Sequence, residues 1–248
     1  MKLVTRSAVA IAAAVALATI ALTGCSPSPA PTTPPKPVNP PPEATYTDGD
    51  LVKILTAANT SLNAGGSVTD LGVLASQTYA PTKDVYGRVL AQGGTFTPAA
   101  CGQLFTKIGQ DVATLGGTTG AYAARLDYGT SILSATSSSN PVDVATLTSL
   151  VSGDLTALTT QCATAQIGLH GLTASFAFKT EDATTDAATT WAYSETGSVG
   201  SATLGSVAVV ALDGNLLIGY EGANSADTVA DGVTAINAVV AAAKSNNG

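Results

Sequence analysis

The chain has 248 residues, of which 45% are hydrophobic and 11% are charged, and its formal net charge is −7 at neutral pH. This hydrophobic content is ample for a folded core, so the composition excludes an intrinsically disordered protein. The excess of acidic residues disfavours nucleic acid and anionic membrane surfaces as partners.

The first 24 residues are organised like an export signal. Lys2 and Arg6 form a basic tip, and an apolar stretch runs from Ser7 to Leu22. This stretch falls short of the ~20 apolar residues that a comfortable membrane span needs, and no later segment approaches that length. We therefore expect residues 1–24 to be a signal peptide, and we expect the exported protein to have no transmembrane helix.

The signal ends in Leu22-Thr23-Gly24-Cys25, which resembles the lipobox of bacterial lipoproteins of the actinobacterial type. The resemblance implies cleavage before Cys25 and a diacylglycerol on the Cys25 sulfur, so that acyl chains such as palmitate anchor the protein in the lipid bilayer. Two acyl chains give stable anchoring where one is marginal. The alternative is a free Cys25 inside a discarded signal peptide. Processing would leave 8 basic and 17 acidic residues, a net charge of −9.

Residues 25–42 are predicted to be a tether, because nine of the twelve prolines lie between Ser26 and Pro42. Such a segment favours extended polyproline II, and its seventeen residues would span roughly 50 Å at ~3.1 Å per residue. Its Ser, Thr and Pro residues resemble glycosylated stalks, so O-glycosylation is a hypothesis that the intact mass of the protein would test. Residues 43–248 are of a length for one extracytoplasmic domain.

The elements of this domain follow in chain order from its apolar spacing. Helical spacing predicts helices at about 48–62, 98–115, 141–158 and 226–244, with Asp48 or Asp50 as the cap of the first. Alternating or short apolar segments predict strands at about 122–132, 167–178, 190–194, 206–212 and 216–220. Asp213-Gly214, between the last two, is a strong hairpin signal. This order predicts an α+β fold, an antiparallel sheet with helices packed on one face.

Once Cys25 is assigned to lipid, Cys101 and Cys162 remain as an even pair in an oxidising compartment, and a disulfide is the default expectation. A metal site would need clustered ligands, and a redox pair would need close spacing such as CxxC. The bridge would connect the second and third predicted helices. No metal and no cofactor are expected.

Catalytic motifs are absent from the sequence, since GxSxG, SxxK, HExxH and phosphate-loop patterns do not occur. His170 is the single histidine, and its position in "IGLHGL" indicates a solvent-facing strand residue. Glu181-Asp182 could serve a hydrolase as a carboxylate pair, but adjacent acids in a turn more often face water. We therefore expect no catalytic residues and no enzyme activity.

The candidate ligand-binding residues are aromatic. Trp191 and Tyr193 share one parity on a predicted strand, and Tyr220 lies on another. Aromatic side chains on a sheet face either pack under helices or line a ligand groove, and the sequence leaves both alternatives open.

The order of elements, with "PAACGQLF", "VALDGNLLIGYEG" and "VADGVTAINAVVAAAK" in place, resembles the extracellular sensor domains of PknH-type kinases and their lipoprotein relatives. The resemblance covers about residues 48–244. It implies an α+β sensor-like fold with a candidate ligand cleft, no known catalysis, and a helix-clamping bridge matched by Cys101 and Cys162.

The sequence thus predicts a lipid-anchored protein on the extracytoplasmic face of the cell membrane. Its domain is expected to act as a ligand-binding or sensor-like module for a small molecule or an envelope component. The alternative is a structural or protein-interaction lipoprotein with no small-molecule ligand.

Overall fold

The computed structural model describes residues 46–73, 92–115, 121–139, 141–149, 155–169, 171–222 and 227–246. The predicted signal peptide, the lipobox with Cys25 and the tether lie outside the described residues, as does His170. None of the helices in the described ranges is both long and apolar enough to cross a membrane.

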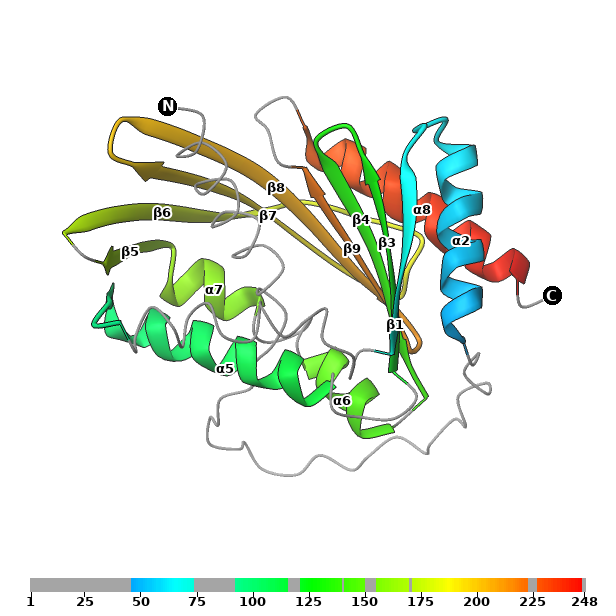
Figure 1. Ribbon diagram of the computed structural model, residues 1–248, viewed down its shortest axis with the longest axis horizontal. Helices are drawn as coiled ribbons and strands as arrows, with labels where there is room; N and C mark the ends of the chain where they lie inside the picture. The colour runs from blue at the N-terminus through cyan, green and yellow to red at the C-terminus, as the bar shows by residue number, and fades with distance from the viewer. Residues whose placement is uncertain are drawn as a thin grey trace.

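The described strands form one sheet with the order β1-β3-β4-β9-β8-β7-β6-β5-β2 (Figure 1). Their bounds are β1 Ser67–Val73, β2 Thr95–Thr97, β3 Ala121–Tyr128, β4 Ser131–Ser138, β5 Thr164–Leu169, β6 Leu172–Glu181, β7 Thr189–Val199, β8 Ala202–Asp213 and β9 Leu216–Gly222. Every neighbouring pair is antiparallel. The predicted α+β class and antiparallel sheet are therefore confirmed.

Helices cover both faces of this sheet. Their bounds are α2 Asp48–Ser61, α5 Ala99–Leu115, α6 Pro141–Ser149, α7 Leu155–Gln161 and α8 Val229–Asn246. Val209 of β8 packs in a core with α2 and α8, whereas its neighbour Ala208 packs in a second core with α5 and α7. Successive residues of a strand point to opposite faces. We call these faces the α2/α8 face and the α5/α7 face; Figure 1 shows the two helix groups on different sides of the strands.

The sequence predicted helices on one face only, and the apolar pattern of the central strands explains the difference. Six of the seven residues of β9 are buried, so both of its faces need a cover. The second helix group packs against other strands of the sheet: α5 contacts β2, α7 contacts β6, and α6 contacts α5 and β4.

The α2/α8 core depends on helices with well-formed N-terminal caps. Thr47 is the N-cap of α2: its hydroxyl accepts a hydrogen bond from the Asp50 backbone N–H, and the Asp50 carboxylate accepts one from the Thr47 backbone. The hydrogen bonds from Thr47 lower the pKa of Asp50 to about 2. The cap is thus Thr47 rather than Asp48 or Asp50, because this reciprocal pair satisfies two free N–H groups at once. Thr228 and Asp231 repeat the arrangement at α8.

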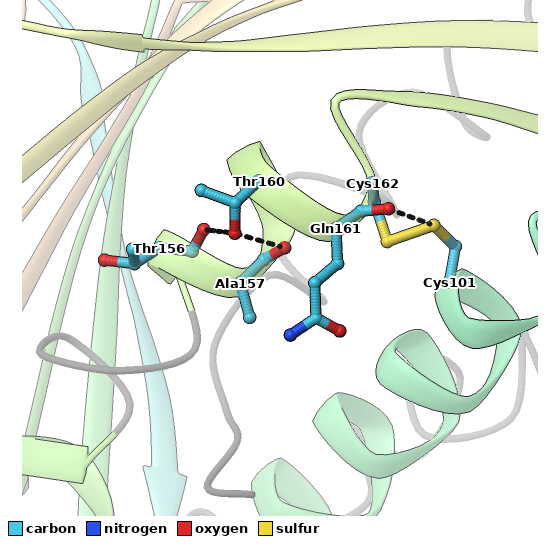
Figure 2. The surroundings of a disulfide bond; sticks show 6 residues. All are labelled: Cys101, Thr156, Ala157, Thr160, Gln161 and Cys162. Carbon is cyan, nitrogen blue, oxygen red and sulfur yellow. Dashed lines mark hydrogen bonds between the residues drawn. A yellow bond between two sulfur atoms is a disulfide. The ribbon is translucent and has the colours of Figure 1, made fainter. Parts of the chain in front are cut away.

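The α5/α7 core is closed by the predicted disulfide, which is confirmed. Cys101 and Cys162 are both fully buried, with their Cα atoms 5.5 Å apart. Figure 2 shows that the bridge joins the first turn of α5 to the residue that follows α7. Since β2 ends just before α5 and β5 begins just after Cys162, the bridge holds both helices at the β2–β5 end of the sheet.

A line of aromatic rings fills the same core. Centroid distances are 6.0 Å for Phe96–Phe105, 6.2 Å for Phe105–Phe178, 6.1 Å for Phe178–Tyr193 and 4.8 Å for Trp191–Tyr193. Ring pairs at these separations add stability beyond the area they bury.

Three predicted elements divide differently in the structure. The strand at 122–132 is the hairpin β3–β4, which turns at Gly129, and the strand at 167–178 is the hairpin β5–β6. The helix at 141–158 corresponds to α6 and α7, with residues 150–154 outside the described ranges. Gly129 has φ of 59°, a conformation that glycine adopts without strain, so this turn reverses the chain where alternation alone predicts continuation. The hairpin predicted at Asp213-Gly214 is confirmed as β8–β9.

Candidate functional site

The first candidate site is a hollow on the α2/α8 face, at the half of the sheet that lies away from those helices. It has a volume of about 630 Å³ and is formed by the ends of β5, β6, β7 and β8 together with Thr97 and Pro98. Thr196 and Ser198 of β7 have the same parity as Ala192, which packs with α2 and α8, so their side chains lie on that face. We call this hollow the polar trough.

Seven of the residues that line the polar trough have polar, uncharged side chains. They are Thr97, Thr164, Gln166, Ser175, Thr196, Ser198 and Thr203. Five of them form one continuous cross-strand row: Thr97 pairs with Gln166, Gln166 with Ser175, Ser175 with Ser198, and Ser198 with Thr203. At a strand spacing of about 4.8 Å, a row across five strands is about 19 Å long.

The hydrogen-bonding groups of this row are available. Within the ranges that the structure describes, none of the seven polar side chains forms a hydrogen bond to another protein group. Threonines outside the trough, in contrast, use their hydroxyls within the protein. Thr180 on the opposite face donates a hydrogen bond to the Thr159 hydroxyl, and Thr160 donates one to the Thr156 carbonyl oxygen at 2.7 Å (Figure 2). The polar trough therefore presents unused donors and acceptors in a hollow, and it is more polar than most small-molecule pockets, which are lined mainly by apolar side chains.

The second candidate site is a pair of buried carboxyl groups on the α5/α7 face. Glu195 of β7 is 3% exposed and Glu221 of β9 is 8% exposed. The two residues flank β8, the strand that lies between β7 and β9. Glu195 pairs with Ser206 and Glu221 pairs with Ala208, and these two partners are two residues apart on β8. In the described part of the chain, Glu195 Oε2 has no hydrogen-bond partner. We call Glu195 and Glu221 the carboxylate pair.

Burial changes the proton affinity of the carboxylate pair. Burial, reinforced by the charge of Glu221, raises the pKa of Glu195 to about 8. Burial also raises the pKa of Glu221 to about 7, while the positive charge of Arg125 acts in the opposite direction. Arg125 is itself held by Asp127, whose Oδ1 accepts a hydrogen bond from Arg125 Nε at 2.8 Å. With a pKa of about 8, Glu195 therefore stays largely protonated at neutral pH, because burial disfavours its charged form.

The three aromatic residues predicted to bind a ligand do not come together. Trp191 and Tyr193 lie side by side on the α5/α7 face, where Tyr193 is fully buried and Trp191 is partly buried. Tyr220 is 2% exposed and lies in the α2/α8 core, on the opposite face. Its hydroxyl lies 3.3 Å from Ser131 Oγ.

The adjacent acids singled out from the sequence have separate surroundings. Glu181 accepts hydrogen bonds from Lys179 at 2.9 Å and from Ser194 at 2.7 Å, and these contacts lower its pKa. Asp182 is exposed. Glu181 therefore belongs to a local ion pair on the α2/α8 face.

Sequence reasoning missed both the polar trough and the carboxylate pair. The predicted strand at 190–194 ended one residue before Glu195, whereas β7 continues to Val199 and gives Glu195 the same parity as Trp191 and Tyr193. Extending the aromatic alternation by one residue would have placed this carboxyl group on the apolar face. The polar trough had no comparable signal, because its row depends on the pairing of five strands from different parts of the chain.

Comparisons with known proteins give structural neighbours only. No family model matches the chain, and no curated protein matches its sequence. The chain is similar to the structure of an uncharacterized protein (Rv0999 ortholog) from Mycobacterium smegmatis, at 14% identity and a TM-score of 0.44, over 80% of this chain and all (100%) of that one. It is also similar to the extracellular domain of PknH from Mycobacterium tuberculosis, at 14% identity and a TM-score of 0.46, over 81% of this chain and 98% of that one. The PknH-type domain named from the sequence is thus among its structural neighbours.

Proposed function

We propose that this protein is a lipid-anchored lipoprotein on the extracytoplasmic face of the cell membrane, and that its domain is a non-catalytic binding or sensor-like module. The polar trough is the observation that carries the proposal of binding. It is an open hollow of about 630 Å³ whose polar groups are unused within the described part of the protein. The anchor is supported by Cys25 directly after the apolar signal, and the tether would hold the trough away from the bilayer.

Two observations favour a small or polymeric ligand over the alternative of a protein-interaction surface. An interaction surface is expected to expose a contiguous apolar patch. Among the described residues, Leu172 is the one large hydrophobic side chain that is exposed, at 69%. The trough lining, in contrast, includes no carboxylate, imidazole, thiol or amine, which suits binding rather than proton-transfer chemistry.

Membrane fractionation tests the anchor. The wild-type protein is expected in the membrane fraction, with acyl mass on a peptide that begins at Cys25, because two acyl chains make anchoring stable. The Cys25→Ser variant is expected to leave the membrane or to keep its signal. A wild-type protein without lipid mass would contradict the anchor.

Hydrogen exchange tests binding at the trough. The full chain, purified in detergent, is incubated with the soluble small-molecule and glycan fraction of its own cell envelope. Amides in residues 164–167, 175–177 and 196–198 are expected to exchange more slowly, and this slowing should disappear in Thr196→Trp, which fills the hollow. Unchanged exchange throughout the domain would contradict a binding function.

A further inference from the structure

The charge of the polar trough narrows the class of ligand, an inference that rests on the proposed function. No charged side chain is part of its lining. The nearest charges along β6 on the same face are Lys179 and Glu181, which pair with each other at 2.9 Å. A charged ligand would therefore lose hydration without gaining a counter-charge, and a neutral ligand would not.

The chemistry of the trough lining narrows the class of ligand further. Six of the seven polar side chains are Ser or Thr hydroxyls, and the seventh is the amide of Gln166. A hydroxyl both donates and accepts, and so does an amide. The ligand that matches such a surface also has groups that donate and accept, which is the property of alcohols and sugars rather than of phosphates or amines.

The shape of the row indicates an extended ligand. The row crosses five strands over about 19 Å, from Thr97 to Thr203. Thr97, Gln166 and Thr203 are exposed along it, so both ends of the row are open. A chain of several sugar rings could lie along the row and continue beyond it.

We propose that the polar trough binds an internal segment of a neutral polysaccharide, which runs across β8, β7, β6, β5 and β2. Hydroxyl–hydroxyl contacts compete with water, and the one aromatic residue of the lining, Phe176, is 4% exposed and offers no stacking surface. The affinity for one short oligosaccharide is therefore weak, and a polymer gains at this single trough only in proportion to the number of equivalent segments that it offers.

The test uses the full chain in detergent and a panel of neutral hexasaccharides (gluco-, manno- and galacto-), with binding followed by ligand-observed NMR. Hexagalacturonate serves as the matched charged probe for α-1,4-linked galactohexaose, because each of its rings carries a carboxylate in place of the C6 hydroxymethyl group. At least one neutral hexasaccharide is expected to bind, and hexagalacturonate is expected to bind at least about tenfold more weakly than galactohexaose or not at all.

Two variants test whether the oligosaccharide contacts the polar trough. Thr196→Val and Thr203→Val each remove one hydroxyl while keeping a β-branched side chain, so the strands are expected to persist. Each should weaken binding of the neutral ligand about three- to tenfold, the loss of one hydrogen bond. Thr69→Val, at an exposed position of β1 on the far edge of the sheet, is the control and should bind like the wild type.

Each other outcome overturns the inference. If hexagalacturonate binds more tightly than galactohexaose, the proposed class of ligand is wrong. If both variants bind the neutral hexasaccharide like the wild type, the polar trough is not its binding site. If the envelope fraction protects the trough from exchange while no neutral hexasaccharide binds, the polysaccharide inference fails and the proposed binding function stands. If the envelope fraction does not slow exchange at the trough and no neutral hexasaccharide binds, the polysaccharide inference and the proposed binding function both fail.

Discussion

At the scale of single residues, Glu195 and Glu221 link stability to pH. Their pKa values in the folded protein, about 8 and about 7, lie above the ordinary value of 4.5. Between pH 4.5 and these folded pKa values, the two glutamates therefore keep protons in the folded state that they release in the unfolded chain. Their contribution to stability is complete below about pH 4.5 and is lost as pH rises toward the folded pKa values.

We predict that the free energy of unfolding falls between pH 5 and pH 7 by up to about 1.4 kcal/mol per pH unit for each of the two glutamates. Glu195→Gln, whose side chain is neutral at every pH, should reduce this slope by about half, because Glu221 still contributes. Urea unfolding at a series of pH values measures it.

The matched control is Glu181→Gln. Glu181 is ion-paired with Lys179 and its pKa is lowered, so its contribution is lost only on acidification below the ordinary pKa. The slope above pH 5 should match that of the wild type. An unchanged slope in Glu195→Gln would show that Glu195 is ionised in the folded protein.

Sequence parity placed single residues well within a strand but not between strands. It put Trp191 and Tyr193 on one face, as observed, but the predicted strand stopped short of Glu195, which lies on that face in β7. It grouped Tyr220 with them, although the sheet register puts Tyr220 on the other face. Parity is a property of one strand, and the face is fixed by pairing with its neighbours.

At the scale of elements, Gly232 sets the distance between α8 and the sheet. A Cβ atom at this position would lie 2.5 Å from Val209 Cγ2 and 2.7 Å from Tyr220 Cδ1. Gly232→Ala should therefore destabilise the protein by about 1–2 kcal/mol, since overpacking outweighs the gain in helix propensity.

Gly49→Ala in α2 is the control for the same substitution in a helix. The nearest atom to its added Cβ is Thr47 Oγ1 at 3.9 Å, so the side chain fits without displacing a neighbour. Denaturant unfolding should show a neutral or slightly stabilising effect. Equal losses at both positions would contradict the close approach of α8.

The disulfide connects α5 and α7 across a sequence separation of 61 residues. The chain-entropy account gives roughly 4 kcal/mol for a closed loop of this length. We expect Cys101→Ala/Cys162→Ala to lose a large part of that value in chemical denaturation, with the melting temperature falling accordingly. A loss below about 1 kcal/mol would show that helix packing alone holds α5 and α7 in place.

Helices and the one tight Asp-Gly turn were predictable because their signals are local. Apolar spacing over about 98–115 and 226–244 is a property of consecutive residues, and the helices α5 and α8 are present there. The β3–β4 turn was missed because polar and apolar residues keep alternating through Gly129. The short strands β1 and β2 were not predicted, since their pairing with β3 and β5 determines them more than their own sequence does.

At the scale of the whole molecule, the arrangement of helices creates the candidate site. α2 and α8 pack over one end of their face, while α5 and α7 pack over the other face, so the trough end of the α2/α8 face stays open (Figure 1). If Cys25 carries the proposed lipid anchor, the predicted tether would place this open end within reach of envelope material. The proposed function joins these two features, an anchor at one end of the chain and a hollow in the folded domain.

Native mass spectrometry of the full chain, extracted from its own membrane, tests this account most directly. For the wild type, mixed with the glycan fraction of its own envelope, we predict one species that carries the mass of the acyl chains and an intact disulfide, together with a bound ligand. In Thr196→Trp, acyl mass and disulfide should persist while the ligand mass is lost. Wild-type protein that carries lipid but no ligand, or a ligand retained equally by Thr196→Trp, would contradict the trough as the binding site.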